Sequence, residues 1–498
     1  MKRTFNPAVG ALGAAGLLLM IMVSNQSLWI DECGTASFAC SSDWESFFEL
    51  LKTDQTSNSQ MPLFMVLAKW WSLLVGRSEY ALRSLNIVFG LIAISCAFLV
   101  GRRTKSGLWP VAVMACHPYF WAYMDEFRPY MMQIAAGWML VLALLKLAAT
   151  DRLTGRDAGL FCAAGVFLAG SSLLGVIPLG ISICVAAWVV RHKIKESTAG
   201  FRLVTAGAGF IISLLGLYYL GKLLTGGGGA KLWVPGISNI FFSFYELLGF
   251  SGLGPGRNEL RGAARSGLMV AVIKGYLPLM GALAAAYLGV ILGLIRMNGS
   301  RRIWVAVSAG VFLTGVVALS GLAAIFGWPF WGRHLAPFYP LPVLIISLLL
   351  ANMSDQWPRL AKIIGCGFLV VLFYSSLNIR FSARFAKDDY RSACQVAEPV
   401  IRAGEKVWWG GCGEAAAFYG IVDETQPEFP KNMISTAQLT STELGQGRPR
   451  MVVLSKAELF DPEGLVRRYL AEKNYQCTHR LAAISIWEPS EKPPNSRK

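Results

Sequence analysis

Long apolar runs recur along the first three quarters of this 498-residue chain and constrain its fold more than any other feature. A helix needs about 17–25 mostly apolar residues to cross a lipid bilayer. Hydrophobic residues make up 54% of the chain and charged residues only 15%, a balance that soluble domains do not have. We therefore predict a mainly α, polytopic membrane protein with about 11 transmembrane helices. The predicted spans are residues 7–24, 80–100, 107–124, 129–149, 157–174, 176–191, 203–221, 268–295, 303–326, 334–351 and 360–378.

Basic residues gather in short loops between these runs, at 102–105, 152–156, 191–195, 301–302 and 359–362. If the spans alternate, every one of these loops lies on the side of Lys2 and Arg3, and the positive-inside rule makes that side the cytoplasm. The sequence thus predicts a multi-pass protein of the inner (plasma) membrane with its N-terminus inside and its C-terminus outside. The first run could also serve as a signal peptide, but it lacks a small-x-small cleavage site, which favours an uncleaved span.

The net charge of +16 is explained by these loops. A nucleic-acid partner would call for a basic stripe interleaved with aromatic residues, and the sequence has none. The expected partner of the apolar runs is the lipid bilayer.

Two outer loops are too long to be simple connectors, at 25–79 and 222–267. Within the first, residues 44–51 and 63–74 have apolar residues at helical spacing with polar interruptions. This pattern is typical of amphipathic helices that lie in the membrane interface.

The composition changes near residue 380, where strand-like and helical pieces begin to alternate. We expect a transmembrane domain over 1–380 and a small soluble α/β domain over 381–498 on the outer face. Cysteines of the first loop and of this tail would then share an oxidising compartment, although their spacing specifies no disulfide. These are Cys33, Cys40, Cys394, Cys412 and Cys477.

Two acidic pairs stand where a predicted span meets an outer loop: Asp31 with Glu32, and Asp125 with Glu126. Ionisable residues at span ends are costly to desolvate and are often kept for a functional site. Carboxylates can act as general bases, and arginine grips phosphate oxygens in a bidentate manner. Arg128 lies three residues after Asp125 and can share its helix face.

Arg333 and His334, at the outer start of the tenth span, are further phosphate candidates. Each element also has a structural interpretation. The first pair could cap an interfacial helix, the second could be a solvated span end, and Arg333 with His334 could anchor a span at the lipid headgroups.

Five strings in this order resemble the GT-C glycosyltransferases of the protein O-mannosyltransferase and aminoarabinose-transferase group. The first is the acidic pair itself. The others read Ser-Gln-Met-Pro-Leu-Phe at 59–64 with Gly-Arg-Ser-Glu-Tyr-Ala-Leu-Arg-Ser-Leu at 76–85, Glu-Phe-Arg-Pro-Tyr at 126–130, and Arg-His-Leu-Ala-Pro-Phe-Tyr-Pro at 333–340. The resemblance covers roughly residues 5–380. Gln-Met-Pro stands where His-Pro-Pro is common in the family, and His334 stands at a usually aromatic position.

The resemblance implies a glycosyltransferase that moves a sugar from a polyprenyl-phosphate donor to an acceptor hydroxyl at the outer face, with inversion at the sugar carbon. Asp31 would be the base with Glu32 beside it, and Asp125 with Glu126 would form a second acidic element. The resemblance implies that the remaining site residues bind substrate or phosphate: Gln60, Arg83, Arg128, Tyr130, Arg333 and His334.

Several properties stay open at the level of sequence. Some members of the group use a divalent cation, Mg²⁺ or Mn²⁺, and others do not. The acceptor could be a protein, a lipid or a glycan. The alternatives to this function are a transporter or flippase of lipid-linked sugars and a related oligosaccharide polymerase or ligase.

Overall fold

The computed structural model describes residues 7–225, 236–256, 259–260, 263, 267–422, 429–439 and 447–490, with side chains from residue 13 onward. It divides into two compact units. The first comprises Met1–Ser24, Glu49–Ala68 and Arg83–Phe385, and the second comprises Asn25–Phe48, Lys69–Leu82 and Ala386–Lys498. The predicted outer loop 25–79 therefore contributes residues to both units.

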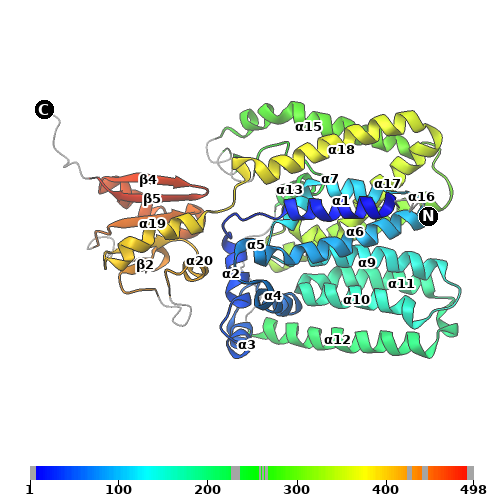
Figure 1. Ribbon diagram of the computed structural model, residues 1–498, viewed down its shortest axis with the longest axis horizontal. Helices are drawn as coiled ribbons and strands as arrows, with labels where there is room; N and C mark the ends of the chain where they lie inside the picture. Colours follow the sequence, from blue (N-terminus) through cyan, green and yellow to red (C-terminus); the bar gives the residue numbers. More distant parts are fainter. Residues whose placement is uncertain are drawn as a thin grey trace, which may run out of the picture. The chain divides into compact units, whose positions relative to one another are not determined.

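The first unit is built from helices that run nearly side by side (Figure 1). Its helices are α1 (Pro7–Met22), α6 (Leu85–Arg103), α7 (Trp109–Cys116), α8 (Pro118–Met124), α9 (Tyr130–Ala149), α10 (Gly155–Ser171), α11 (Val176–Val190), α12 (Ala199–Leu224), α13 (Ile237–Leu247), α15 (Met269–Ile291), α16 (Gly299–Phe326), α17 (Pro340–Gln356) and α18 (Pro358–Phe381). Short 3₁₀ helices are η1 (Leu173–Gly175), η2 (Ile194–Glu196), η3 (Leu292–Leu294), η4 (Gly332–Phe338) and η5 (Ala383–Phe385).

Seven helices of the described chain are long and apolar enough to cross a membrane, or eight if the bent pair of η4 and α17 is one span. The prediction of a polytopic, mainly α protein is confirmed by these helices. The count of eleven stays a prediction, because α1 and α10 are helical but shorter than the seven.

The predicted span 107–124 is instead two short helices, α7 and α8, with a break at His117. Pro118 causes the break, since it lacks an N–H and pushes the preceding residue out of the helical region. His117 accordingly has φ −88° and ψ 125°.

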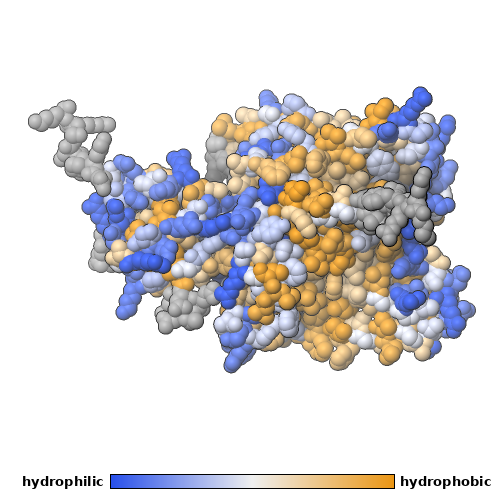
Figure 2. Space-filling view, in the orientation of Figure 1, coloured by the Kyte–Doolittle hydropathy of each residue, from blue (hydrophilic) through white to orange (hydrophobic). Residues whose placement is uncertain are grey.

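The helices differ in how deeply they are buried within the unit. The apolar window of α9 is 83% buried, whereas those of α12 and α15 are 11% and 17% buried. Close packing around α9 is visible at Gly137, where a Cβ atom would meet the carbonyl oxygen of Pro337. Figure 2 shows hydrophobic residues gathered over the helical unit, as expected for helices whose outer faces contact lipid.

The basic loops come together at one end of the helices (right in Figure 1). Lys193 Nζ donates to the carbonyl oxygen of Thr150 at 2.6 Å, which joins two of them. Arg301 donates to the carbonyl oxygen of Lys105 at 3.1 Å and pairs with Asp355 at 2.5 Å. This arrangement is the one that alternating spans require.

The second unit contains a five-stranded sheet in the order β2-β1-β3-β5-β4. Its strands are β1 (Val407–Gly410), β2 (Met433–Ser435), β3 (Met451–Ser455), β4 (Tyr475–Leu481) and β5 (Ile484–Pro489). The first three are parallel, and β5 pairs antiparallel with both β3 and β4. The helices after residue 386 are α19 (Tyr390–Arg402), α20 (Gly413–Phe418), α22 (Ala457–Phe460) and α23 (Leu465–Glu472), with η6 (Thr436–Gln438). The predicted C-terminal α/β fold is confirmed.

Helices of the predicted outer loop are α2 (Ile30–Ala39), α3 (Trp44–Thr53), α4 (Pro62–Val75) and α5 (Glu79–Arg83). The two amphipathic helices expected from sequence correspond to α3 and α4. Helix α2 belongs to the second unit and packs against α20.

Candidate active site

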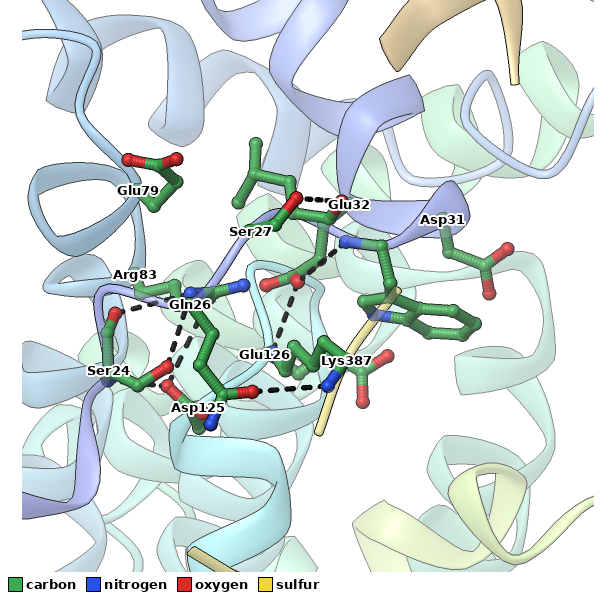
Figure 3. Close-up of polar contacts among 12 residues, drawn as sticks. Ser24, Gln26, Ser27, Asp31, Glu32, Glu79, Arg83, Asp125, Glu126 and Lys387 are labelled. Carbon is green, nitrogen blue, oxygen red and sulfur yellow. Dashed lines mark hydrogen bonds and ion pairs between the residues drawn. The ribbon is translucent and has the colours of Figure 1, made fainter. Parts of the chain in front are cut away.

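Asp125 lies in the first unit at the C-terminal end of α8, in a buried polar cluster (Figure 3). Its Oδ1 accepts the backbone N–H of Ser24 at 2.5 Å. The Arg83 Nε lies 4.0 Å from the same oxygen, and the Arg83 side chain is 0% exposed. Arg83 also donates to the carbonyl oxygen of Ser24 at 3.2 Å. The cluster therefore joins the segment after α1 to α5 and α8.

Glu126 is half-buried and follows directly, in a loop held by Asn86. The amide nitrogen of Asn86 donates to the carbonyl oxygens of Glu126 at 2.7 Å and of Met124 at 3.2 Å. These bonds satisfy carbonyls that the end of a helix leaves without a partner.

Arg128 is 4% exposed, and its guanidinium is oriented by the segment before α4. It donates to Asn58 Oδ1 at 2.6 Å and to Ser57 Oγ at 3.2 Å. Gln60 lies in the same segment, and its carbonyl oxygen accepts the N–H of Leu173. The structure thus brings the predicted residues 60 and 128 to neighbouring parts of the first unit.

A chain of aromatic rings links the string at 126–130 to the string at 333–340. The Tyr119 ring stacks on Tyr339 at 5.1 Å and meets Tyr123 at 4.7 Å. Tyr123 in turn contacts Tyr130 at 4.9 Å. The hydroxyl of Tyr119 donates to the carbonyl oxygen of Gly332 at 2.8 Å, directly before Arg333.

His334 and Arg333 lie in the first turn of η4 and are half-buried. His334 Nδ1 accepts the N–H of Trp331 at 3.2 Å, so this ring caps the turn. Glu246 on α13 packs against η4, because a Cβ atom at Gly332 would meet its carboxylate. Sequence reasoning missed this acid, whose local signal is a single carboxylate in the mostly apolar stretch 240–250.

The other acidic pair belongs to the second unit, in the first turn of α2 (Figure 3). Glu32 is 0% exposed. Its Oε2 accepts the N–H of Trp29 at 3.3 Å and pairs with Lys387 Nζ at 3.0 Å. Glu32 therefore does cap α2, as one interpretation of the sequence expected, and its charge is balanced as well. Asp31 is half-buried.

Residues of the C-terminal α/β portion hold the chain just before α2. The Tyr419 hydroxyl accepts the N–H of Leu28 at 2.9 Å and contacts Glu79 Oε1 at 3.1 Å. Burial raises the pKa of Tyr419, so the phenol stays protonated and donates a hydrogen bond to Glu79. Arg391 pairs with Glu79 at 3.1 Å and donates its own N–H to Ser27 Oγ at 3.1 Å.

The two acidic pairs are therefore built alike. One acid of each is buried and paired with a basic side chain, Glu32 with Lys387 and Asp125 with Arg83. The other acid of each, Asp31 or Glu126, is half-buried. Sequence reasoning missed Lys387, because it stands far along the chain in a segment without a recognisable motif.

The described residues contain no group of three or more His, Cys, Asp and Glu side chains placed to hold a metal ion.

No protein-family model and no curated protein sequence matches the chain. Among solved structures, ArnT from Cupriavidus metallidurans in the apo state covers 96% of this chain and 97% of its own, at 14% identity and a TM-score of 0.46. The archaeal oligosaccharyltransferase AglB from Archaeoglobus fulgidus, in complex with an inhibitory peptide and a dolichol-phosphate, covers 98% of this chain and 75% of its own, at 13% identity and a TM-score of 0.47. The match to the arabinofuranosyltransferase AftD from Mycobacteria covers 97% of this chain and 40% of the AftD chain, at 14% identity and a TM-score of 0.48. At these identities and TM-scores the likeness by itself assigns no activity to the chain.

Proposed function

We propose that this protein is a membrane glycosyltransferase that moves a sugar from a polyprenyl-phosphate donor to an acceptor hydroxyl. The observation that carries the proposal is the meeting of two distant strings, 126–130 and 333–340, at one end of the helical unit. These are the strings by which the sequence resembles GT-C glycosyltransferases.

The position of this meeting point suits a lipid-linked donor. Helix α9 begins at Tyr130, beside the two strings, and ends at Ala149, beside the basic loops. Its 20 residues span about 30 Å, the thickness of the hydrocarbon core. A polyprenyl tail can therefore stay in the bilayer while its phosphate reaches Arg128 and Arg333, at the end of α9 where the two strings meet. We place this end on the outer face of the inner membrane.

Asp31 is our candidate for the base that takes the proton of the acceptor hydroxyl. The pairing of Glu32 with Lys387 and Trp29 supports this choice, since it gives Glu32 a structural task, and Asp31 is the more exposed acid of the two. The same reasoning selects Glu126 over Asp125 as the second acid. That Asp31 and Glu126 serve one reaction is implied by the resemblance of the sequence to GT-C glycosyltransferases.

Arg333 is our first candidate for binding the leaving phosphate. It is half-buried in the first turn of a 3₁₀ helix, whereas Arg128 is buried and donates to Asn58 and Ser57. A guanidinium at this point would stabilise the negative charge that grows on the phosphate as the glycosidic bond breaks. Arg128 would then orient the segment that contains Gln60 and contribute its charge.

The test uses purified protein in proteoliposomes with a panel of labelled polyprenyl-phosphate sugars. The acceptors are glycan, lipid and protein fractions from the envelope of a deletion strain. The readout is release of polyprenyl phosphate together with sugar incorporation, with and without a chelator of divalent cations. We expect release with at least one donor, and a fall of about 10²–10⁴ in Asp31→Asn, the usual contribution of a general base. Glu45→Gln is the matched control, because Glu45 is an exposed acid of the same loop.

Three outcomes would contradict the proposal or part of it. Movement of intact donor across the bilayer without release would favour the flippase. Transfer of whole oligosaccharides instead of single sugars would favour the polymerase or ligase. Wild-type release by Asp31→Asn would remove Asp31 from the chemistry.

A further inference from the structure

Two cysteines that are far apart in sequence meet inside the second unit. Cys33 lies in the first turn of α2, directly after Glu32, and Cys412 immediately precedes α20. About 380 residues separate them in the chain. Helices α2 and α20 pack against each other, which brings the two side chains to one place.

The two thiols lie in one buried part of the second unit, close enough for Cys412 to influence the Cys33 thiol. The Cys33 thiol also donates to the carbonyl oxygen of Leu28 at 3.4 Å, and the Cys412 thiol lies 4.0 Å from the carbonyl oxygen of Ile30. Cys33 is 0% exposed and Cys412 is 4% exposed. The sulfurs therefore point into one shared interior position.

Their surroundings offer no other obvious task for two thiols. The described residues contain no group of three or more His, Cys, Asp and Glu side chains placed to hold a metal ion there. Glu414 Oε2 accepts a hydrogen bond from the Cys412 thiol at 3.1 Å.

We propose that Cys33 and Cys412 form a disulfide that fastens helix α2, with its acidic pair, to the C-terminal α/β fold. The bond forms by exchange with a protein or small-molecule disulfide outside the cytoplasm. The two thiols lose two protons and two electrons as the S–S bond forms, and the oxidant's disulfide is reduced to two thiols. The outward orientation proposed above would expose the folding pair to an oxidising compartment, where disulfides form and persist. The bond itself does not depend on glycosyl transfer.

The environment of the pair also predicts when the bond forms. Burial raises the pKa of the Cys33 thiol, and so do the neighbouring Cys412 and the nearby carboxylates of Glu32 and Glu414. Only the thiolate attacks a disulfide, so the Cys33 thiol of the folded, reduced protein is a poor nucleophile for exchange. The bond would therefore form while the chain folds, and it would act as a permanent fastening.

The test is a disulfide map of the full-length protein in membranes of a host with an oxidising exterior. Thiols are trapped with acid and alkylated in denaturant, and the protein is digested with chymotrypsin without reductant. Cleavage after aromatic residues isolates Cys33 in the peptide 30–38 and Cys412 in the peptide 410–418. It also places Cys40 in 39–44 and Cys394 in 391–408, so each alternative partner has its own peptide.

We expect mass spectrometry to find 30–38 joined to 410–418, and to lose this species after reduction with dithiothreitol. Alkylated Cys33 and Cys412 in unreduced protein would overturn the proposal. So would a bond from Cys412 to Cys394, whose thiol is also buried nearby.

A second measurement needs only the wild-type protein for its main result. Dithiothreitol present during expression should lower the melting temperature of the wild-type protein by several degrees. If the variant C33S/C412S folds, reductant should leave its melting temperature unchanged. The control C477S keeps the pair intact and should respond as the wild type does. A wild-type protein that melts identically with and without reductant would count against the bond.

Discussion

Asp125→Asn tests whether the buried acid of the second pair has a structural or a catalytic task. The substitution removes the negative charge and keeps an oxygen that can accept the N–H of Ser24, now 2.5 Å from Asp125 Oδ1. It leaves the guanidinium of Arg83, which is 0% exposed, without the carboxylate 4.0 Å away. We therefore expect the folded state to lose stability.

The magnitude follows from the geometry. Removing one partner of a buried ion pair costs about 3–5 kcal/mol. The 4.0 Å separation between Arg83 and Asp125 is long for an ion pair, which lowers this figure. The hydrogen bond from Ser24 survives, although a neutral acceptor makes it roughly half as strong. We expect a loss of about 2–3 kcal/mol in the free energy of unfolding, or roughly 30–150-fold in the folding equilibrium.

The assay is unfolding in mixed micelles with increasing dodecyl sulfate, followed by tryptophan fluorescence. Asp151→Asn is the matched control, because Asp151 is exposed in a loop at the opposite end of α9. The double variant with Arg83→Met should lose less than the two single variants together, since it removes both charges. A variant Asp125→Asn that unfolds like the wild type but no longer transfers sugar would refute the structural assignment.

Further tests address neighbouring parts of the structure. Arg128→Lys keeps the charge but loses the planar fork that bonds both Asn58 and Ser57, so we expect the free energy of unfolding to fall by about 1–3 kcal/mol in micelle unfolding. We also expect a rise in the donor concentration that half-saturates release. An unchanged variant would make Arg128 a headgroup anchor. Gly137→Ala should destabilise by about 1–3 kcal/mol, because the new methyl meets the Pro337 carbonyl. Gly180→Ala, where nothing lies within 4 Å, should be neutral or stabilising, and equal effects would show that α9 packs differently. Reporter fusions after residue 490 should be active only with a periplasmic enzyme, and those near residue 197 only with a cytoplasmic one.

The sequence predicted the helices well because their signal is local. A run of about 20 apolar residues identifies a span without reference to the rest of the chain, and α9 and α16 fall within a few residues of the predicted bounds. Prediction failed over 107–124, where hydropathy favoured one span and Pro118 divides the segment into two short helices. The proline was visible, but an apolar window does not register a lost backbone hydrogen bond.

The candidate site was predictable only in part, because its organisation depends on distant partners. The two acidic pairs and Arg128 were apparent from their places at span ends. The sequence could not show that Lys387 balances Glu32, since the two stand about 355 residues apart and no periodicity connects them. Asn58 and Asn86 orient Arg128 and the loop around Glu126 through hydrogen bonds, and uncharged amides give no signal in a pattern of charges.

The common plan of the two pairs has an electrostatic reason. Two adjacent carboxylates repel each other, and ionisation of both is costly where water is partly excluded. Lys387 and Arg83 offset the charge of the inner acid in each pair, at 3.0 Å and 4.0 Å. We therefore propose that the acid beside the neutralised one in each pair, Asp31 or Glu126, takes part in the chemistry.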